Sequence, residues 1–216
     1  MEEITDEITD GTALADERDT EERLRAVLAR HRRTGDTAEL RLSYEDLGRP
    51  RVEVPGLAED VRAAVVHAYA PRRAAATSDP RWQVEALCTE PPAPVDAVEL
   101  RGRAMIALAT AGRTPQRPMP CDLYPDEVDG HFDVILYTGG LRNHRRPGEL
   151  FLSPLGPFVG GSDQDRHVRR AFAAAGFHWI DEPTGAIRLP GLDLHHRDRR
   201  KVLCVEDLLL VHWHDR

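Results

Sequence analysis

Apolar residues along this chain of 216 residues switch several times between the three-to-four-residue spacing of a helix and the strict alternation of a strand. The helical spacing predicts helices over 20–33, 57–69, 162–175 and 206–214. Alternation and continuous apolar runs predict strands over 40–44, 51–54, 82–87, 132–137, 149–152, 177–180, 186–189 and 201–204. Residues 98–106 can form a strand or a helix, and their alternating start and the internal Gly102 favour the strand. This mixture predicts an α+β fold, with an antiparallel sheet or a small split barrel flanked by three to four helices.

Glycine and capping residues predict where several of these elements end. Gly35 and Gly176 predict the ends of two helices, and Ser162 predicts the cap at the start of the second one. Gly48 lies between the two alternating segments of 40–54, which predicts a β-hairpin there. A second hairpin is predicted over 177–189, around the turn Pro183-Thr184-Gly185.

Negative charge is concentrated at the start of the chain. Residues 1–22 hold ten acidic residues and one basic residue, so of the net charge of −8 the remaining residues carry +1. Few apolar residues and dense like charge predict that residues 1–19 are a disordered acidic tail. Residues 20–216 are then predicted to be a single domain, with a sub-boundary left open within 112–130.

The composition limits the class of protein. No apolar run approaches the roughly 20 residues of a membrane span, and an acidic start does not look like a signal peptide, so a soluble cytoplasmic protein is predicted. A nearly neutral body argues against nucleic-acid binding. Of 29 basic residues only Lys201 is lysine, which points to a high-GC, bacterial genome. Three cysteines without a CxxC pair predict thiols rather than disulfides or a zinc ribbon.

Histidines near the end of the chain raise the hypothesis of a metal site. His196 and Asp198 would share one face of an extended backbone, so they are the candidate metal ligands. His212 and His214 would also share a face on a strand. On the predicted helix, however, they point about 200° apart, so structural or surface histidines are the alternative interpretation.

Two loops are candidates for binding an anionic ligand. Residues 142–146 form a basic cluster whose candidate ligand-binding residues are Arg142, His144, Arg145 and Arg146. A solvated loop tip is the alternative. The glycine-rich stretch 156–162 runs into a helix start, which suits an anion, but without a P-loop lysine a tight turn followed by a cap is the favoured interpretation.

Residues 39–109 resemble the core of split β-barrel proteins, the pyridoxamine-phosphate-oxidase-like flavin binders. The resemblance rests on the Gly48-Arg49-Pro50 hairpin, on the strand 82–87 before a proline-rich bend, and on Leu100-Arg101-Gly102-Arg103-Ala104 as the next strand. It implies a small barrel, usually dimeric, that binds flavin mononucleotide, haem or a deazaflavin. Arg101 and Arg103 match the position from which such proteins reach a cofactor phosphate. The usual lysine and hydroxyl contacts are not recognisable, and the chain from Phe132 onward has no counterpart.

Three functions of different classes follow from these patterns. The first choice is a non-enzymatic binding, regulatory or immunity-type accessory protein, because no catalytic motif is recognised. It would have a protein partner or a small-molecule ligand, and a homodimer is left open. The alternatives are a split-barrel flavin- or haem-binding oxidoreductase and a metal-dependent hydrolase that uses the C-terminal histidines. The catalytic residues and the cofactor stay undetermined.

Overall fold

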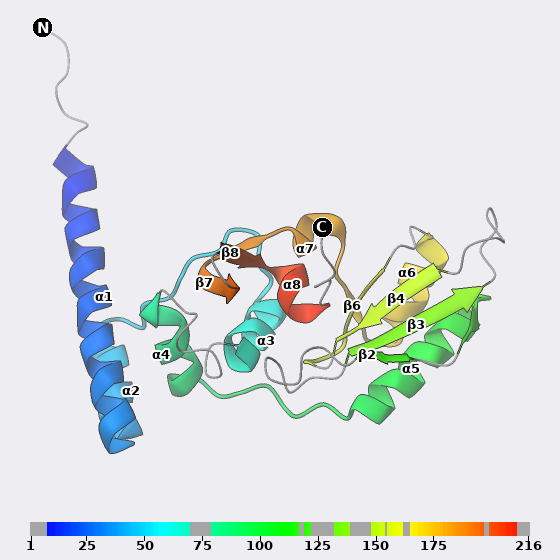
Figure 1. The fold of residues 1–216 in the computed structure, drawn as a ribbon, viewed down its shortest axis with the longest axis horizontal. Helices are drawn as coiled ribbons and strands as arrows, with labels where there is room; N and C mark the ends of the chain where they lie inside the picture. The colour runs from blue at the N-terminus through cyan, green and yellow to red at the C-terminus, as the bar shows by residue number, and fades with distance from the viewer. Residues whose placement is uncertain are drawn as a thin grey trace, which may run out of the picture. The chain divides into compact units, whose positions relative to one another are not determined.

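The computed structural model describes residues 8–69, 79–116, 119–121, 132–138, 148–153, 155–161, 165–196 and 199–210 (Figure 1). Its helices and strands confirm the α+β class. The chain groups into two compact units, the first of Met1–Pro55, Val66–Pro91 and Leu189–Val202, and the second of Gly56–Val65, Pro92–Arg188 and Leu203–Arg216. The single domain predicted over 20–216 stays a prediction.

The first unit is mainly helical. It contains α1 (Ile8–Thr34), α2 (Thr37–Asp46), α4 (Pro80–Cys88), the end of α3 (Glu59–Tyr69), and most of the paired strands β7 (Arg188–His196) and β8 (Arg199–Cys204). Its core joins α1, α2 and α4 through the buried side chains Leu24, Leu28, Leu40, Tyr44 and Val84. The predicted helix over 57–69 and the predicted strand over 201–204 are confirmed.

The ends of α1 and α2 follow from their capping residues. Gly35 has a φ of 71°, and its amide N lies 2.7 Å from the carbonyl O of His31, so α1 stops where the glycine predicts. The carboxylate of Asp36 then accepts from the amide N atoms of Ala38 and Glu39 and starts α2. At its other end α1 begins at Ile8, so it overlaps the tail predicted over 1–19; residues 1–7 lie outside the described residues.

The strand predicted over 40–44 is wrong, because this segment is α2. Leu40 and Tyr44 are four residues apart, share one helix face and are buried in the core. Leu42, which alternation would place beside them, is instead 66% exposed. With α2 in place of its first strand, the hairpin predicted over 40–54 is wrong as well.

The strand predicted over 82–87 is also a helix, α4. Asp79 caps it by accepting from the amide N of Arg81, and Pro80 occupies the first turn, where the missing N–H costs nothing. Every residue from Trp82 to Ala86 is buried, so the apparent alternation does not mark two faces. The indole Nε1 of Trp82 donates to the carbonyl O of Pro190 at 2.8 Å, which fixes α4 to β7.

The second unit is built on a sheet of six strands. These are β1 (Thr114–Pro115), β2 (Met119–Cys121), β3 (Phe132–Thr138), β4 (Gly148–Leu152), β5 (Phe158–Gly161) and β6 (His178–Trp179). The order is β1-β3-β4-β5-β6, with β2 also paired to β3. The pairs are antiparallel except β5 with β6, which run parallel across α6 (Arg166–Ala174). The strands predicted over 132–137 and 149–152 are confirmed.

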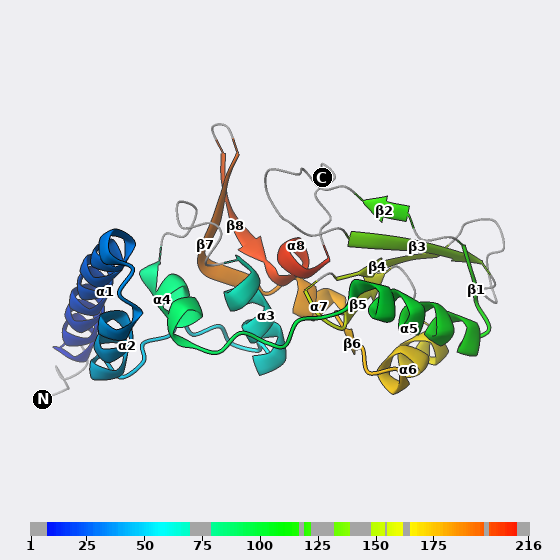
Figure 2. The same cartoon turned by 90° about the horizontal axis from the view of Figure 1, so that it is seen from below.

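Two helices cover one face of this sheet, as Figure 2 shows for α5 (Ala97–Thr110) and α6. Leu150 and Leu152, on one face of β4, pack against this layer. The shared core consists of Leu100, Ala104, Ala107, Leu108, Leu150, Leu152, Val159, Val168, Phe172 and Phe177. Gly176, with a φ of 77°, follows α6 and confirms its predicted end. Asp165 caps the start of α6; Ser162, the predicted cap, lies outside the described residues.

The glycine-rich stretch begins with a bend at 156–157 and continues as a strand over 158–161, so most of it belongs to the sheet. Gly160 and Gly161 belong to β5, and Gly161 is required by the close approach of the β4 backbone. A Cβ at Gly161 would lie 2.3 Å from the carbonyl O of Glu149 on β4, and one at Gly160 would lie 2.2 Å from a methyl carbon of Leu210. Their lack of a side chain therefore serves packing.

The hairpin predicted over 177–189 is wrong. Its turn residues belong to the short helix α7 (Glu182–Gly185), where Asp181 accepts from the amide N of Thr184 at 3.1 Å. The two flanking strands pair elsewhere, β6 with β5 and β7 with β8. The chain then enters α8 (Val205–Leu209), which confirms the start of the last predicted helix; residues 211–216 lie outside the described residues.

No helix among the described residues is long and apolar enough to span a bilayer. The strands of the described residues form the six-stranded sheet and the β7–β8 pair, and they do not close into a barrel. None of the three segments on which the split-barrel resemblance rests is a strand. Residues 48–50 follow α2, residues 82–87 lie within α4 and residues 100–104 lie within α5 (Ala97–Thr110).

Candidate binding surface

Helix α5 begins at a well-formed cap. The carboxylate of Asp96 accepts from the amide N of Val98 at 2.8 Å and from that of Glu99 at 3.2 Å. The helix ends before Gly112, whose φ is 70°. Both ends satisfy backbone groups that a helix otherwise leaves unpaired. The helix is thus defined locally, before any tertiary contact is considered.

The inner face of α5 lies in the core of the second unit. Leu100, Ala104, Ala107 and Leu108 are at most 2% exposed. Their spacing of three and four residues places them on one side of the helix, against the sheet and α6. This packing fixes which residues of α5 face outward.

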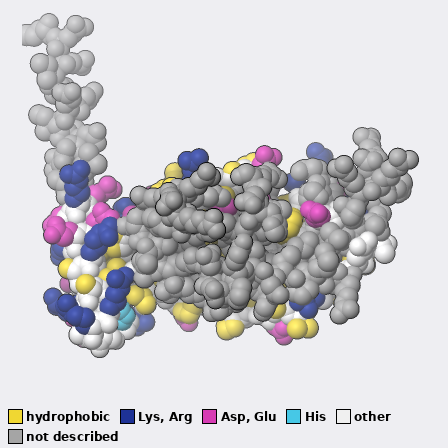
Figure 3. Space-filling model, in the orientation of Figure 1, with side chains coloured by type: hydrophobic (Ala, Val, Ile, Leu, Met, Phe, Trp, Pro, Cys, Tyr) yellow, Lys and Arg dark blue, Asp and Glu magenta, His cyan; other side chains and the backbone are white. Residues whose placement is uncertain are grey.

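The outward face of α5 is mainly apolar, and the exposed Glu99 borders it beside Ile106. Val98 is 72% exposed and Ile106 is 67% exposed, and Gly102 and Ala109 are exposed between and beyond them. At 100° per residue, Val98 and Ile106 each lie within about 40° of Gly102 around the helix axis. Apolar side chains reach the surface at the lower edge of Figure 3, where α5 begins. We call Val98, Gly102, Ile106 and Ala109 the outward face of α5.

The exposed apolar side chains are not evenly spread. Among the residues whose side chains the structure describes, the large exposed apolar ones are Leu42, Val95, Val98, Ile106 and Val202. Val98 and Ile106 belong to the outward face, and Val95 directly precedes the cap of the same helix. Scattered apolar side chains are normal on a protein surface. The grouping of two of them on α5 makes its outward face the candidate binding surface.

Arg103, predicted to contact a cofactor phosphate, is engaged within the protein. Its guanidinium donates through Nε to the carbonyl O of Ala175 at 3.1 Å, and a second bond runs from Nη2 to the same oxygen. The guanidinium carbon also lies 5.1 Å from the ring centre of Phe177. The prediction that Arg101 and Arg103 project from one strand is wrong, because on α5 they point about 200° apart.

The remaining predicted site residues are not placed. Arg142, His144, Arg145 and Arg146 lie outside the described residues, as do Asp198, His212 and His214. His196 ends β7, but its side chain is not among those described. Within the described part of the chain, no group of three or more His, Cys, Asp and Glu side chains is arranged to hold a metal.

A polar group in the first unit resembles a catalytic pair but is arranged differently. Nε2 of His67 lies 3.0 Å from Oγ1 of Thr89, and this hydroxyl donates to the carbonyl O of Glu85 at 2.6 Å. A hydroxyl has one proton, so the imidazole must donate to Thr89 and does not take its proton. Burial lowers the pKa of His67, against the opposing charge of Glu85. The buried Glu85 is itself paired, 3.3 Å from Nε of Arg51.

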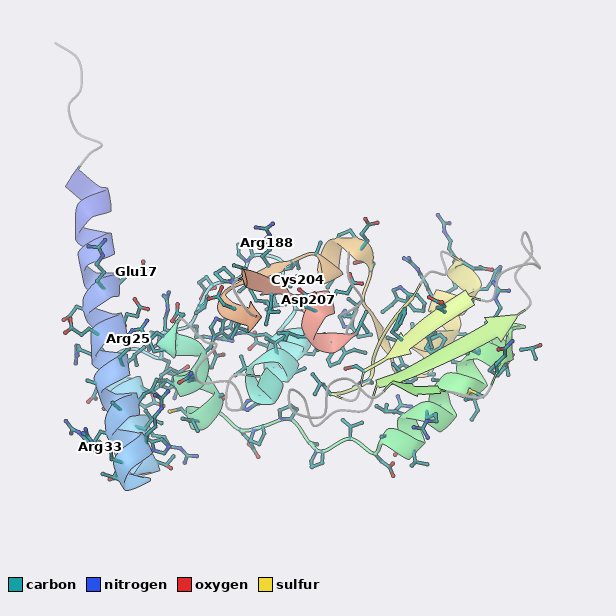
Figure 4. All side chains as sticks on the ribbon, in the orientation of Figure 1. Glu17, Arg25, Arg33, Arg188, Cys204 and Asp207 are labelled. Atoms are coloured by element: carbon teal, nitrogen blue, oxygen red, sulfur yellow. The ribbon has the colours of Figure 1, made fainter. Side chains whose placement is uncertain are left out.

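The two described thiols are also structural. Burial raises the pKa of Cys88 to about 11, so the reactive thiolate is scarce near neutral pH. Sγ of Cys204 lies 3.1 Å from Oδ2 of Asp207 at the start of α8 (Figure 4). The backbone N–H of Cys204 donates to the same oxygen at 3.0 Å, which makes this pair a helix cap.

Basic side chains gather along α1 in Figure 3, and Figure 4 labels Arg25 and Arg33 among them. Several have partners within the first unit. Arg25 lies 2.7 Å from Glu21, Arg30 pairs with Glu39, and Arg32 donates to Gln83 at 2.9 Å. The contacts of Arg30 and Arg32 join α1 to α2 and α4, whereas the pair of Arg25 with Glu21 lies within α1. The absence of nucleic-acid binding stays a prediction.

Sequence reasoning missed the outward face because it placed 98–106 in a strand. The signal for a helix was Asp96 followed three residues later by Glu99, which is a typical helix start. The spacing of Leu100, Ala104, Ala107 and Leu108 also has the helical period. Once the helix is assigned, Val98 and Ile106 fall opposite the core.

Comparison of the chain with protein-family models, curated proteins and solved structures found no match.

Proposed function

We propose that this chain is a non-enzymatic binding protein that recognises a protein partner through the outward face of α5. The observation that carries the proposal is the exposure of Val98 and Ile106, at 72% and 67%, on one side of the same helix. Removing such side chains from water stabilises a complex by roughly 25 cal/mol per Å² of apolar surface before the costs of association. A helix laid against a partner's groove is a common mode of recognition.

Two further contacts support a rigid surface rather than a cofactor site. Arg103 is held against the C-terminal end of α6 through Nε and Nη2, and its Nη1 lies 3.8 Å from Glu99 of the same helix. Met105 packs partly into the core beside the buried face of α5. A helix fixed in this way presents its outward face with little loss of conformational freedom on binding.

Site-specific photo-crosslinking in an extract of the native host tests the proposal. A photoreactive phenylalanine replaces Val98 or Ile106, and the matched control replaces Arg170, an exposed residue of α6. We expect a defined protein adduct at positions 98 and 106 that is absent at 170. In the chain labelled at 98, Ile106→Glu should remove the adduct without changing the melting temperature by more than a few degrees. Equal labelling at all three positions, or none, contradicts the proposal.

A further inference from the structure

Residues 90–95, which connect α4 to α5, are exposed to water along their whole length. They form neither helix nor strand, and every residue from Thr89 to Glu99 is exposed. Within the described part of the chain, residues 90–95 make no hydrogen bond and no ion pair. Figure 1 draws the segment as an open connection between the two helices. Its backbone polar groups are therefore hydrated, and its conformation depends on its own residues.

Proline restricts the backbone of this segment to an extended form. The segment consists of Glu90-Pro91-Pro92-Ala93-Pro94-Val95. Each proline ring holds φ near about −65°, and the residue before each proline is also kept away from helical backbone. The caps on either side are extended as well, since Thr89 has a ψ of 159° and Asp96 has one of 109°. These restraints favour polyproline II, a left-handed helix with three residues per turn and no internal hydrogen bonds.

Three residues per turn divide such a helix into three ridges. Pro91 and Pro94 lie on the first ridge, and Pro92 and Val95 lie on the second. The three prolines are exposed, and Val95 is one of the large apolar side chains on the surface, at 38% exposure. The third ridge begins with the carboxylate of Glu90. The segment thus presents two neighbouring apolar ridges and one polar ridge.

From this layout we infer that residues 90–95 are a polyproline II ligand for a partner protein whose groove is lined with aromatic side chains. Pro91 and Pro94 have the P-x-x-P spacing that such grooves recognise. A helix already restricted by proline loses little conformational freedom on binding. The polar ridge stays in water, and Glu90 favours a groove with a basic side chain at its rim. This surface is separate from the outward face of α5, and the inference does not depend on that face.

Photo-crosslinking of the full chain tests the arrangement of the ridges. A photoreactive phenylalanine replaces Val95, on an apolar ridge, and in the matched control it replaces Ala93, on the polar ridge. Each chain is irradiated in an extract of the native host, and the crosslinked peptide of the partner is sequenced by mass spectrometry. In the chain labelled at 95, Pro91→Ala together with Pro94→Ala removes one apolar ridge, whereas Ala93→Ser changes only the polar one.

We expect one defined adduct at position 95, little or none at 93, and a crosslinked partner peptide that contains tryptophan or tyrosine. The paired proline substitutions should remove the adduct without changing the melting temperature by more than a few degrees, and Ala93→Ser should leave it. No adduct at 95, equal adducts at 95 and 93, or an adduct that survives the proline substitutions overturns the inference and leaves the segment a stiff spacer. A partner peptide without an aromatic residue overturns it as well.

Discussion

The guanidinium of Arg103 on α5 donates two hydrogen bonds to the carbonyl O of Ala175, the C-cap residue that follows α6. The last carbonyls of a helix lack intrahelical partners and carry partial negative charge. The guanidinium of Arg103 supplies hydrogen-bond donors to this carbonyl and places a positive charge beside the negative end of the helix. Gly176 is part of the same contact, since a Cβ there would lie 2.7 Å from Nη2 of Arg103.

This contact predicts a structural role for Arg103. Arg103→Ala should lower the free energy of unfolding by about 1–2 kcal/mol, because it removes two charge-assisted hydrogen bonds and the contact with Phe177. Urea denaturation measures the change. Arg170→Ala, on an exposed position of α6, is the control and should change stability by no more than about 0.5 kcal/mol. Equal effects of the two substitutions would contradict the role given to Arg103.

Two glycines give opposite predictions for the same substitution. Gly102→Ala should stabilise the monomer by about 0.5–1 kcal/mol, because the site is an exposed helix interior with open space. Gly161→Ala should destabilise by about 1–3 kcal/mol, because its Cβ would lie 2.3 Å from the carbonyl O of Glu149. Thermal unfolding of both variants at low protein concentration checks them. A destabilising Gly102→Ala would mean that α5 is not a helix at this position.

The sequence analysis succeeded where the spacing of the apolar residues was unambiguous or a glycine marked the end of a helix. The strand over 132–137 is a continuous apolar run, and α1 ends at Gly35 as predicted. It failed where short helices mimic alternation. In α2, Leu40, Leu42 and Tyr44 read as one strand face, yet Leu42 is exposed while the other two are buried. Asp36, Asp79 and Asp96 each cap one of the misassigned helices, and these caps are the signal that distinguishes a helix from a strand there.

The candidate surface depends on that same distinction. On a strand, Val98, Leu100 and Gly102 would share a face, and Arg101 and Arg103 would share the other. On α5, Leu100 is buried while Val98 is 72% exposed, so the residues that share a face on the helix differ from those that would share one on a strand. A binding surface defined by side-chain direction cannot be predicted until the period of its element is known.

Acid should weaken the contact at the start of α6. The carboxylate of Asp165 accepts from the amide N of His167 at 2.8 Å and from Nη2 of Arg113 at 2.7 Å. These bonds hold the pKa of Asp165 below its ordinary value. The stabilisation they give is therefore complete above the unfolded pKa of about 4 and is lost as pH falls through the lower folded value.

Asp165→Asn keeps a capping side chain but removes this charge. We expect the stability difference between the unmodified chain and Asp165→Asn to be constant from pH 7 to about pH 5 and to shrink below about pH 4. Urea denaturation at several pH values measures it. A difference that stays constant down to pH 2 would show that the Asp165 charge contributes nothing.

The thiol of Cys88 should be slow to react. Burial raises its pKa to about 11, whereas an unperturbed cysteine titrates near 8.5. At pH 8 the thiolate fraction is then lower by roughly a hundredfold. Alkylation with iodoacetamide, followed by peptide mass spectrometry in buffer and in urea, measures the rate at Cys88. Equal rates in the two conditions would contradict the burial of this thiol.

The central claim is that the outward face of α5 binds a protein partner, and photo-crosslinking in an extract of the native host tests it most directly. A chain that carries a photoreactive phenylalanine in place of Ile106 should form a defined protein adduct. The same label in place of Leu42, an apolar residue of similar exposure on α2, should not form this adduct. No adduct at position 106, or the same adduct at both positions, would contradict the claim.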